Sequence, residues 1–141
     1  MAHDTFDAAL SGRSVRPDSI TTNGGGSFIA MLSSDTSIMT YQVAYSQLSS
    51  AATQVHLHGP AADTVVAGII VDLAALPAGG SGTIDLGTSG SAAGSIDLDL
   101  PVTGGVSGDS LRKLMILGLL YVDVHTVNHS GGELRGQLRR Q

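Results

Sequence analysis

The chain has 141 residues, of which seven are Lys or Arg and twelve are Asp or Glu, so its formal net charge is −5. This length predicts one domain over residues 1–141, with a core that needs no covalent cross-link. The acidic balance argues against DNA or RNA as a partner, because nucleic-acid binding needs clustered basic side chains, and the absence of cysteine excludes thiolate metal sites, disulfides and cysteine nucleophiles.

Short strands separated by turns are predicted over the first two thirds of the chain. The nineteen glycines indicate frequent turns, and with only 4% aromatic residues the core must be built mainly from Val, Ile, Leu and Ala. Tyr41, Val43 and Tyr45 alternate with Thr40, Gln42 and Ala44, as in a strand with one buried face. The predicted strands are residues 5–10, 27–32, 37–45, 54–58, 67–73, 82–86 and 95–100. Residues 87–94, which are Gly, Ser, Ala and Thr, are predicted to form a loop.

One short helix interrupts the strand pattern in the last third of the chain. Asp109 or Ser110 is expected to cap it, and Leu111, Leu114 and Met115 share a face at helical spacing. Strands over residues 119–126 and 133–138 follow, so the expected fold is an all-β antiparallel sandwich. The longest apolar run, residues 114–122, is too short to cross a bilayer, and no membrane insertion is expected.

Four of the five histidines lie in two short stretches and suggest a metal site. His56 and His58 are two residues apart on a strand and point to the same side, and His125 and His129 lie near the final turn. Imidazole is the commonest protein ligand of transition metals. If the two strands are neighbours, the four rings can meet around one ion at the surface; otherwise they are solvated polar side chains.

The neighbours of these histidines suggest supporting roles. Tyr121 and Asp123 share the face of His125, so Asp123, or Glu133, is expected to orient the imidazoles, and Tyr121 is expected to be an outer ligand, a redox relay or a cover. Arg135 lies two residues after Glu133 and either closes the terminal hairpin by pairing with it or steers an anion such as superoxide toward the metal.

The identity of the ion follows from the donor set. A set of four imidazoles with no thiolate and no acidic ligand favours copper, with zinc as the alternative. His3 offers a separate chelating group if the processed amino terminus lies beside it, or else belongs to a disordered start.

The histidine motifs together resemble the CHRD domain. They are His-Leu-His-Gly-Pro-Ala at 56–61 and Tyr-Val-Asp-Val-His-Thr followed by His-Ser-Gly-Gly-Glu-Leu-Arg-Gly-Gln within 121–137, joined by family-like pieces at 6–12 and 68–73. Asp123 and Ser130 stand where the family usually has Asn and Pro. The resemblance implies an immunoglobulin-like or Greek-key β-sandwich in an extracellular or periplasmic location, with the leader absent from this chain, and no reaction common to the family.

A second likeness, in strand pattern only, is to copper–zinc superoxide dismutase, which also carries a His-x-His strand on a Greek-key sandwich. Three functions are therefore expected as alternatives: an exported metal-binding protein, with copper the favoured ion; a small copper oxidoreductase of superoxide-dismutase-like type; or a non-catalytic interaction module that contacts a protein partner or a second copy of itself.

Overall fold

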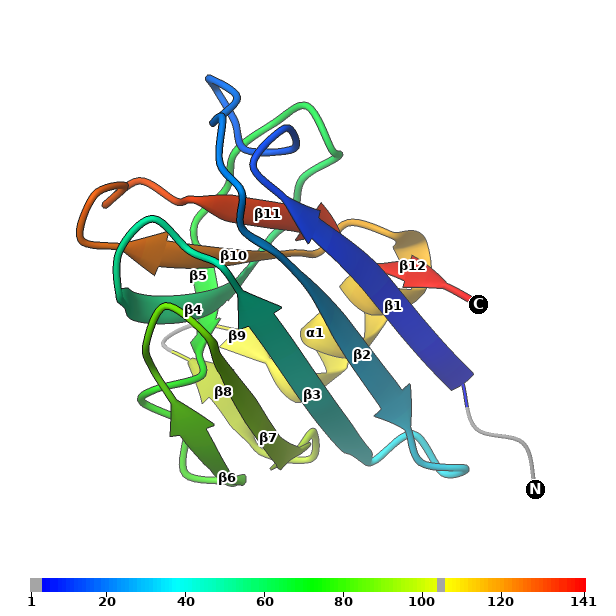
Figure 1. Cartoon of the computed structure of the whole chain (residues 1–141). Coiled ribbons are helices and arrows are strands. Elements are labelled where there is room, and N and C mark those ends of the chain that lie inside the picture. Colours follow the sequence, from blue (N-terminus) through cyan, green and yellow to red (C-terminus); the bar gives the residue numbers. More distant parts are fainter. Residues whose placement is uncertain (1–3, 104–105) are drawn as a thin grey trace.

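A computed structural model describes residues 4–103 and 106–141, so His3 and its predicted role lie outside the described residues (Figure 1). The first strands and their bounds are β1 (Asp4–Ser11), β2 (Gly25–Leu32), β3 (Ile38–Ser46), β4 (Ala52–His58), β5 (Ile69–Asp72), β6 (Gly80–Asp85) and β7 (Gly90–Asp97). The remaining elements are β8 (Pro101–Thr103), β9 (Val106–Ser107), α1 (Gly108–Leu117), β10 (Tyr121–Thr126), β11 (Leu134–Gln137) and β12 (Arg139–Arg140).

Nearly all strands belong to one antiparallel sheet that curls back on itself. Its strand order is β5-β4-β10-β11-β1-β2-β3-β7-β6, with β12 also paired to β1, while β8 and β9 form a separate pair. In Figure 1, β1, β2, β3 and β7 lie across the front, and β4, β5 and β10 lie behind them. The predicted all-β antiparallel sandwich with one short helix is confirmed.

The core fills the space inside the curled sheet, and strands β1, β2 and β3 alternate buried side chains that face it with exposed ones. The pattern is most regular in β3, where every second residue from Met39 to Tyr45 is buried. Helix α1 adds Leu111 and Met115, both fully buried, to this core. Its cap is Ser107, whose side chain accepts a hydrogen bond from the Ser110 amide, rather than the predicted Asp109 or Ser110.

Strand β7 begins inside the segment that was predicted to be a loop. Gly90 to Gly94 pair with β3 on one side and β6 on the other. A Cβ atom at Gly94 would lie 2.7 Å from the hydroxyl oxygen of Tyr41, so the small residues make room for that ring. Glycine and alanine have low strand propensity, so the sequence gives no strand signal here. Pairing with β3 and β6 determines that the segment is extended.

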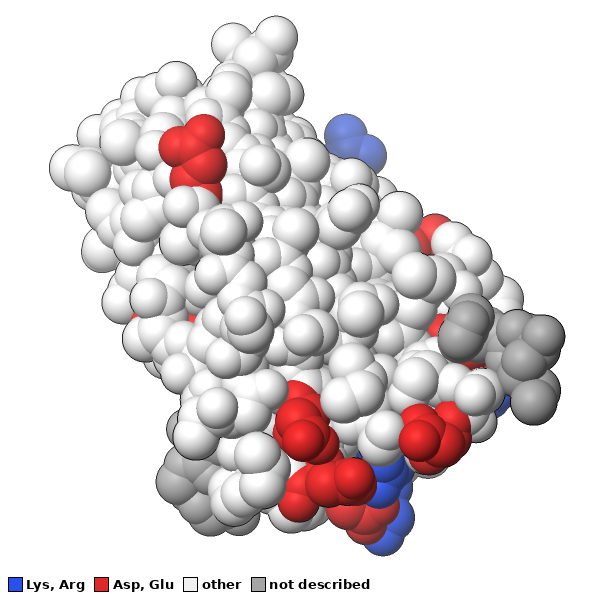
Figure 2. All heavy atoms as spheres, turned by 90° about the horizontal axis from the view of Figure 1, so that it is seen from below, with Lys and Arg blue, Asp and Glu red and all other residues white. Residues whose placement is uncertain are grey.

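Charged side chains are sparse on the molecular surface. Figure 2 shows a face that is mostly uncharged, with acidic groups gathered around a few basic ones at one end. On α1, Asp109 pairs with Arg112 at 2.6 Å and with Lys113 at 3.1 Å. This face therefore carries no extended basic patch of the kind that nucleic acids need. Within the described ranges, no helix is long and apolar enough to span a bilayer.

Candidate metal centre

A row of polar side chains crosses four neighbouring strands at the same level. Asp72 of β5 is the register partner of His56 on β4, His56 is the partner of Asp123 on β10, and Asp123 is the partner of Arg135 on β11. Residues paired in this way project from the same face of the sheet. His58 and His125 lie two residues away from this row on β4 and β10, so the same face collects three imidazoles and two carboxylates.

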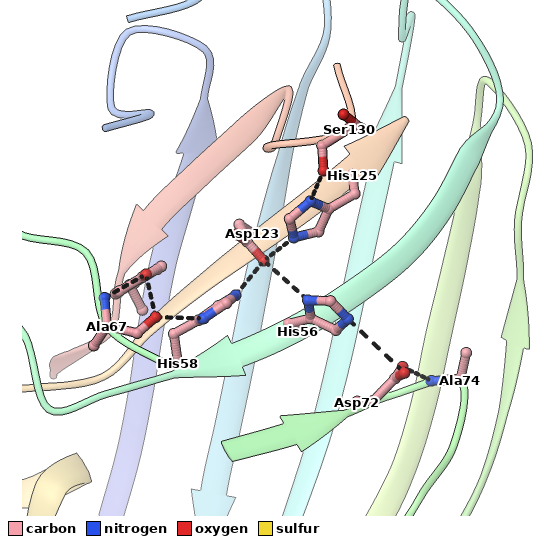
Figure 3. Close-up of polar contacts among 9 residues, drawn as sticks. His56, His58, Ala67, Asp72, Ala74, Asp123, His125 and Ser130 are labelled. Carbon is pink, nitrogen blue, oxygen red and sulfur yellow. Dashed lines mark hydrogen bonds and ion pairs between the residues drawn. The ribbon is translucent and has the colours of Figure 1, made fainter. Parts of the chain in front are cut away.

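Three imidazoles converge on one carboxylate oxygen (Figure 3). Oδ1 of Asp123 lies 2.9 Å from Nε2 of His58, 2.9 Å from Nε2 of His125 and 3.8 Å from Nδ1 of His56. One ligand atom from each of these four residues fits within 4.8 Å of all the others. In a tetrahedral zinc shell with bonds of about 2.0–2.2 Å, ligand atoms are about 3.4 Å apart, so small side-chain movements suffice to enclose an ion.

The cluster is buried, which corrects the expectation of a surface site. His56, His58, Asp123 and His125 are only 3 to 9% exposed. Side chains and backbone of loops lie over this face of the sheet, and the wall of the small cavity beside it includes Val15, Val66 and Gly132. Gly132 has a φ of 119°, a conformation that favours glycine, so the turn between β10 and β11 can fold back toward Asp123.

Backbone carbonyls fix the orientation of two of the rings. Nδ1 of His58 lies 3.0 Å from the carbonyl oxygen of Ala67, and Nδ1 of His125 lies 2.9 Å from that of Ser130. A carbonyl oxygen only accepts hydrogen bonds, so each Nδ1 carries the hydrogen. In a neutral ring, Nε2 then carries a lone pair and points at the Asp123 carboxylate, which is also an acceptor.

The third ring, His56, has no hydrogen-bond partner among the described residues for either nitrogen, although both nitrogens are buried. Its Nε2 atom lies 3.8 Å from Oδ2 of Asp72, and its Nδ1 atom faces Asp123. Burial, reinforced by the neighbouring His125, lowers the pKa of His56, so this ring is neutral at pH 7 and keeps a lone pair. Asp72 is placed to orient the ring from outside, as carboxylates do for metal-bound histidines.

Asp123 and His125 shift each other's pKa. Burial would raise the pKa of Asp123, but hydrogen bonding and charge from His125 and His58 lower it overall. Burial would likewise lower the pKa of His125, but the Asp123 carboxylate at 2.9 Å raises it. The cluster therefore contains an ionised carboxylate, which a positive charge at the centre of the cluster stabilises.

The predicted residues outside this cluster have other neighbours. His129 is half-buried in the connection between β10 and β11 and is not in the group of converging ligand atoms. The Tyr121 ring stacks on His58 with centroids 4.7 Å apart, and the Arg135 guanidinium lies 3.5 Å from the Tyr121 centroid. Since β4 and β11 flank β10 on opposite sides, the Tyr121 ring is held between His58 and Arg135 and covers one side of the site.

Glu133, the only glutamate of the chain, does not form the expected ion pair with Arg135. Its fully buried carboxylate accepts hydrogen bonds from the Thr22, Ser49 and Thr126 hydroxyls and from the Ser49 amide. Burial raises and these donors lower its pKa, with a net lowering. Glu133 thus connects two loops, which carry Thr22 and Ser49, to the end of β10 instead of contacting an imidazole.

The comparison with protein families agrees with the motifs around this cluster. The family model of the CHRD domain matches residues 6–138. The chain belongs to the CHRD domain family. No curated protein and no solved structure matches it. Both histidine-bearing strands of this CHRD domain fall within the matched region, so the cluster is part of the domain itself.

Sequence reasoning gave Asp123 an outer role and missed Asp72. Asp123 places a carboxylate oxygen among the imidazoles, so an acidic group is available to an ion where the sequence suggested imidazoles alone. Asp72 ends a predicted strand, but its contact with His56 depends on the pairing of β4 with β5. The sequence shows His and Asp at alternating positions of predicted strands, but this pattern does not specify which strands pair. The contact between Asp72 and His56 could therefore not be predicted.

Proposed function

We propose that this CHRD domain binds one divalent transition-metal ion through His56, His58, His125 and Asp123. The observation that carries the proposal is the convergence of acceptors. The carbonyls of Ala67 and Ser130 turn two Nε2 lone pairs toward the Asp123 carboxylate, with unpartnered His56 beside them. A metal cation at the centre satisfies this arrangement, and its binding would replace the imidazole protons that otherwise supply the positive charge.

Copper is the ion that we propose first, with zinc as the alternative. Three nitrogens and one carboxylate oxygen suit both ions, and a site of given geometry generally binds Cu²⁺ more tightly than Zn²⁺. The sequence favoured copper over zinc because it suggested imidazole ligands alone. With the Asp123 carboxylate in the cluster, this reason for preferring copper no longer applies. Competition between the two ions for the metal-free protein, followed by elemental analysis, decides between them.

The direct test is metal titration of the metal-free protein by calorimetry, with His56→Gln and Asp72→Asn beside the parent. The parent is expected to bind one ion per chain. His56→Gln loses a ligand, whereas Asp72→Asn loses only an outer partner and is expected to weaken affinity by roughly 10–100-fold. Asp63→Asn is the matched control, because it changes an exposed carboxylate that pairs with Arg139 and is not among the converging ligand groups. No bound ion, or equal affinity in all four proteins, contradicts the proposal.

A redox activity of the copper form is the second candidate, because the site is accessible. A cavity of about 160 Å³ reaches His58, Asp123 and His125, so a small molecule can approach the ion. An open coordination position and a reversible Cu(II)/Cu(I) couple are the requirements for a superoxide-dismutase-like oxidoreductase. Superoxide turnover by the copper-loaded protein tests this candidate, and an inert copper form leaves the protein as a metal carrier.

We propose an extracellular or periplasmic location for this function, on the strength of the membership in the CHRD family. Fractionation of cells that express the native gene, with an antibody against the chain, tests the location independently of metal binding.

A further inference from the structure

Arg135 is a buried cation with an unused hydrogen-bond donor beside the metal cluster. The residue is 2% exposed, and its Nη2 atom donates to the carbonyl oxygen of Ala62 at 3.0 Å. Its Nη1 atom is buried and has no hydrogen-bond partner in residues 4–103 and 106–141. In this described part of the chain, no carboxylate pairs with the guanidinium at ion-pair distance. A buried donor left without a partner is costly, so its retention points to a ligand.

A second arginine faces the same space. Arg16 and Arg135 both line the cavity of about 160 Å³, together with His58, Asp123 and His125. Two guanidinium groups around one cavity repel each other, and an anion bound between them would remove this repulsion. The cavity volume is several times the roughly 30 Å³ that one water occupies, so a small oxyanion fits with solvent beside it.

The Arg135 side chain is preorganised for this role. Its guanidinium is held against the Tyr121 ring at 3.5 Å, and the ring is stacked on His58 at 4.7 Å. A fixed planar guanidinium matches the geometry of planar oxyanions such as carboxylates better than any other side chain does. Little conformational freedom is then lost when the anion binds.

We propose that the cavity is a subsite for a small planar oxyanion of the carboxylate or bicarbonate class, held by Arg135 and Arg16 next to the metal ion. The position beside the ion rests on the proposed metal function, because a bound divalent cation offsets the negative charge of Asp123 in the cavity wall. The anion is then either a second ligand of the ion or a substrate that meets it there. The net charge of the chain is negative and repels anions, whereas the two arginines make this cavity locally attractive to an anion.

The test follows the arginine side-chain Nε–H signals by NMR while sodium formate or sodium bicarbonate is exchanged for sodium chloride at constant ionic strength. It uses the metal-free and the zinc-loaded protein. Saturable shifts of the Arg135 signal and of the Gly131 and Gly132 amides are expected in both, with tighter binding in the zinc-loaded form. Shifts that rise linearly without saturation in both forms overturn the proposal.

Two variants and one control define the subsite. Arg16 is half-buried and lines the cavity, and Arg16→Gln is expected to weaken formate binding at least threefold. Arg135→Gln is expected to abolish formate binding. Arg13→Gln removes the same charge from an exposed position three residues away and is expected to leave binding unchanged. Equal effects of Arg16→Gln and Arg13→Gln overturn the proposal even if Arg135→Gln fails to fold. Zinc binding without an anion response refutes the subsite alone, whereas an anion response without zinc binding refutes the metal function alone.

Discussion

Replacing Glu133 by Gln tests how the β10–β11 hairpin is held over the site. The carboxylate accepts four hydrogen bonds, at 2.6 to 2.9 Å, from residues of two loops and from the last residue of β10. A hydrogen bond to a charged group contributes about 1 kcal/mol more than a neutral one, so four bonds sum to about 4 kcal/mol. The neutral amide is cheaper to bury and the hydroxyls of Ser49 and Thr126 can rotate to accept, which leaves an expected loss of roughly 1–3 kcal/mol at pH 7.

The pH dependence of this loss has a definite sign. The folded-state pKa of Glu133 lies below its ordinary value of 4.5, so its contribution to the free energy of unfolding is complete above about pH 4.5 and disappears as the pH falls through the folded-state pKa. The difference between the parent and Glu133→Gln is therefore largest near neutrality and shrinks in acid. Urea unfolding at pH 7 and at several acidic pH values measures it.

Asp18→Asn is the matched control for this experiment, because it removes the same charge from an exposed loop. It is expected to change the free energy of unfolding by less than about 0.5 kcal/mol. The reasoning fails if Glu133→Gln is as stable as Asp18→Asn at pH 7, or if its deficit grows as the pH is lowered.

Three further predictions concern the site. Tyr121→Phe removes the hydroxyl that bonds to the Ala67 backbone amide and carbonyl, and a loss of about 1 kcal/mol in urea unfolding is expected, with faster proteolysis near Ala67; unchanged stability and proteolysis contradict this. Gly132→Ala places a side chain at a φ of 119° and is expected to cost about 1–3 kcal/mol by the same assay, and a neutral substitution contradicts the strain. Metal affinity is expected to fall as the pH is lowered, because the Asp123 carboxylate, against the opposing effect of burial, raises the pKa of His125 above its ordinary value of 6.5 and this ring must lose its proton to bind; calorimetry at several pH values checks it, and an affinity independent of pH excludes imidazole ligands.

The fold was largely predictable because short apolar stretches are separated by turn residues, and burial alternates with a period of two in β1, β2 and β3. The alternation in β3 and the histidine strands is visible in the sequence, and so is the helical spacing of Leu111 and Met115. Strand β7 was not predicted because Gly90 to Gly94 are small residues that pack beside the tyrosine rings of β3 and bury only one small side chain, Ala92. Such a segment shows no hydrophobic pattern, and only its neighbours determine its structure.

The candidate site was predictable only as far as local spacing reaches. The spacing of His56 and His58 placed both rings on one face, and the same reasoning placed Asp123 with His125. The pairing of β4 with β10 brings the two stretches together, and no single sequence specifies that pairing. The burial of the site was missed because the sequence does not show that the segments around Val15, Val66 and Gly132 fold over this face of the sheet.

Electron paramagnetic resonance of the Cu²⁺-loaded protein, combined with copper-to-protein stoichiometry, tests the central claim most directly. One copper per chain is expected, with three imidazole nitrogens in its equatorial ligand set, and His129→Gln is expected to leave the spectrum unchanged while His125→Gln removes one nitrogen. A spectrum that loses a nitrogen in His129→Gln but none in His125→Gln, or a chain that binds no copper and no zinc, contradicts the claim that His56, His58, His125 and Asp123 hold the ion.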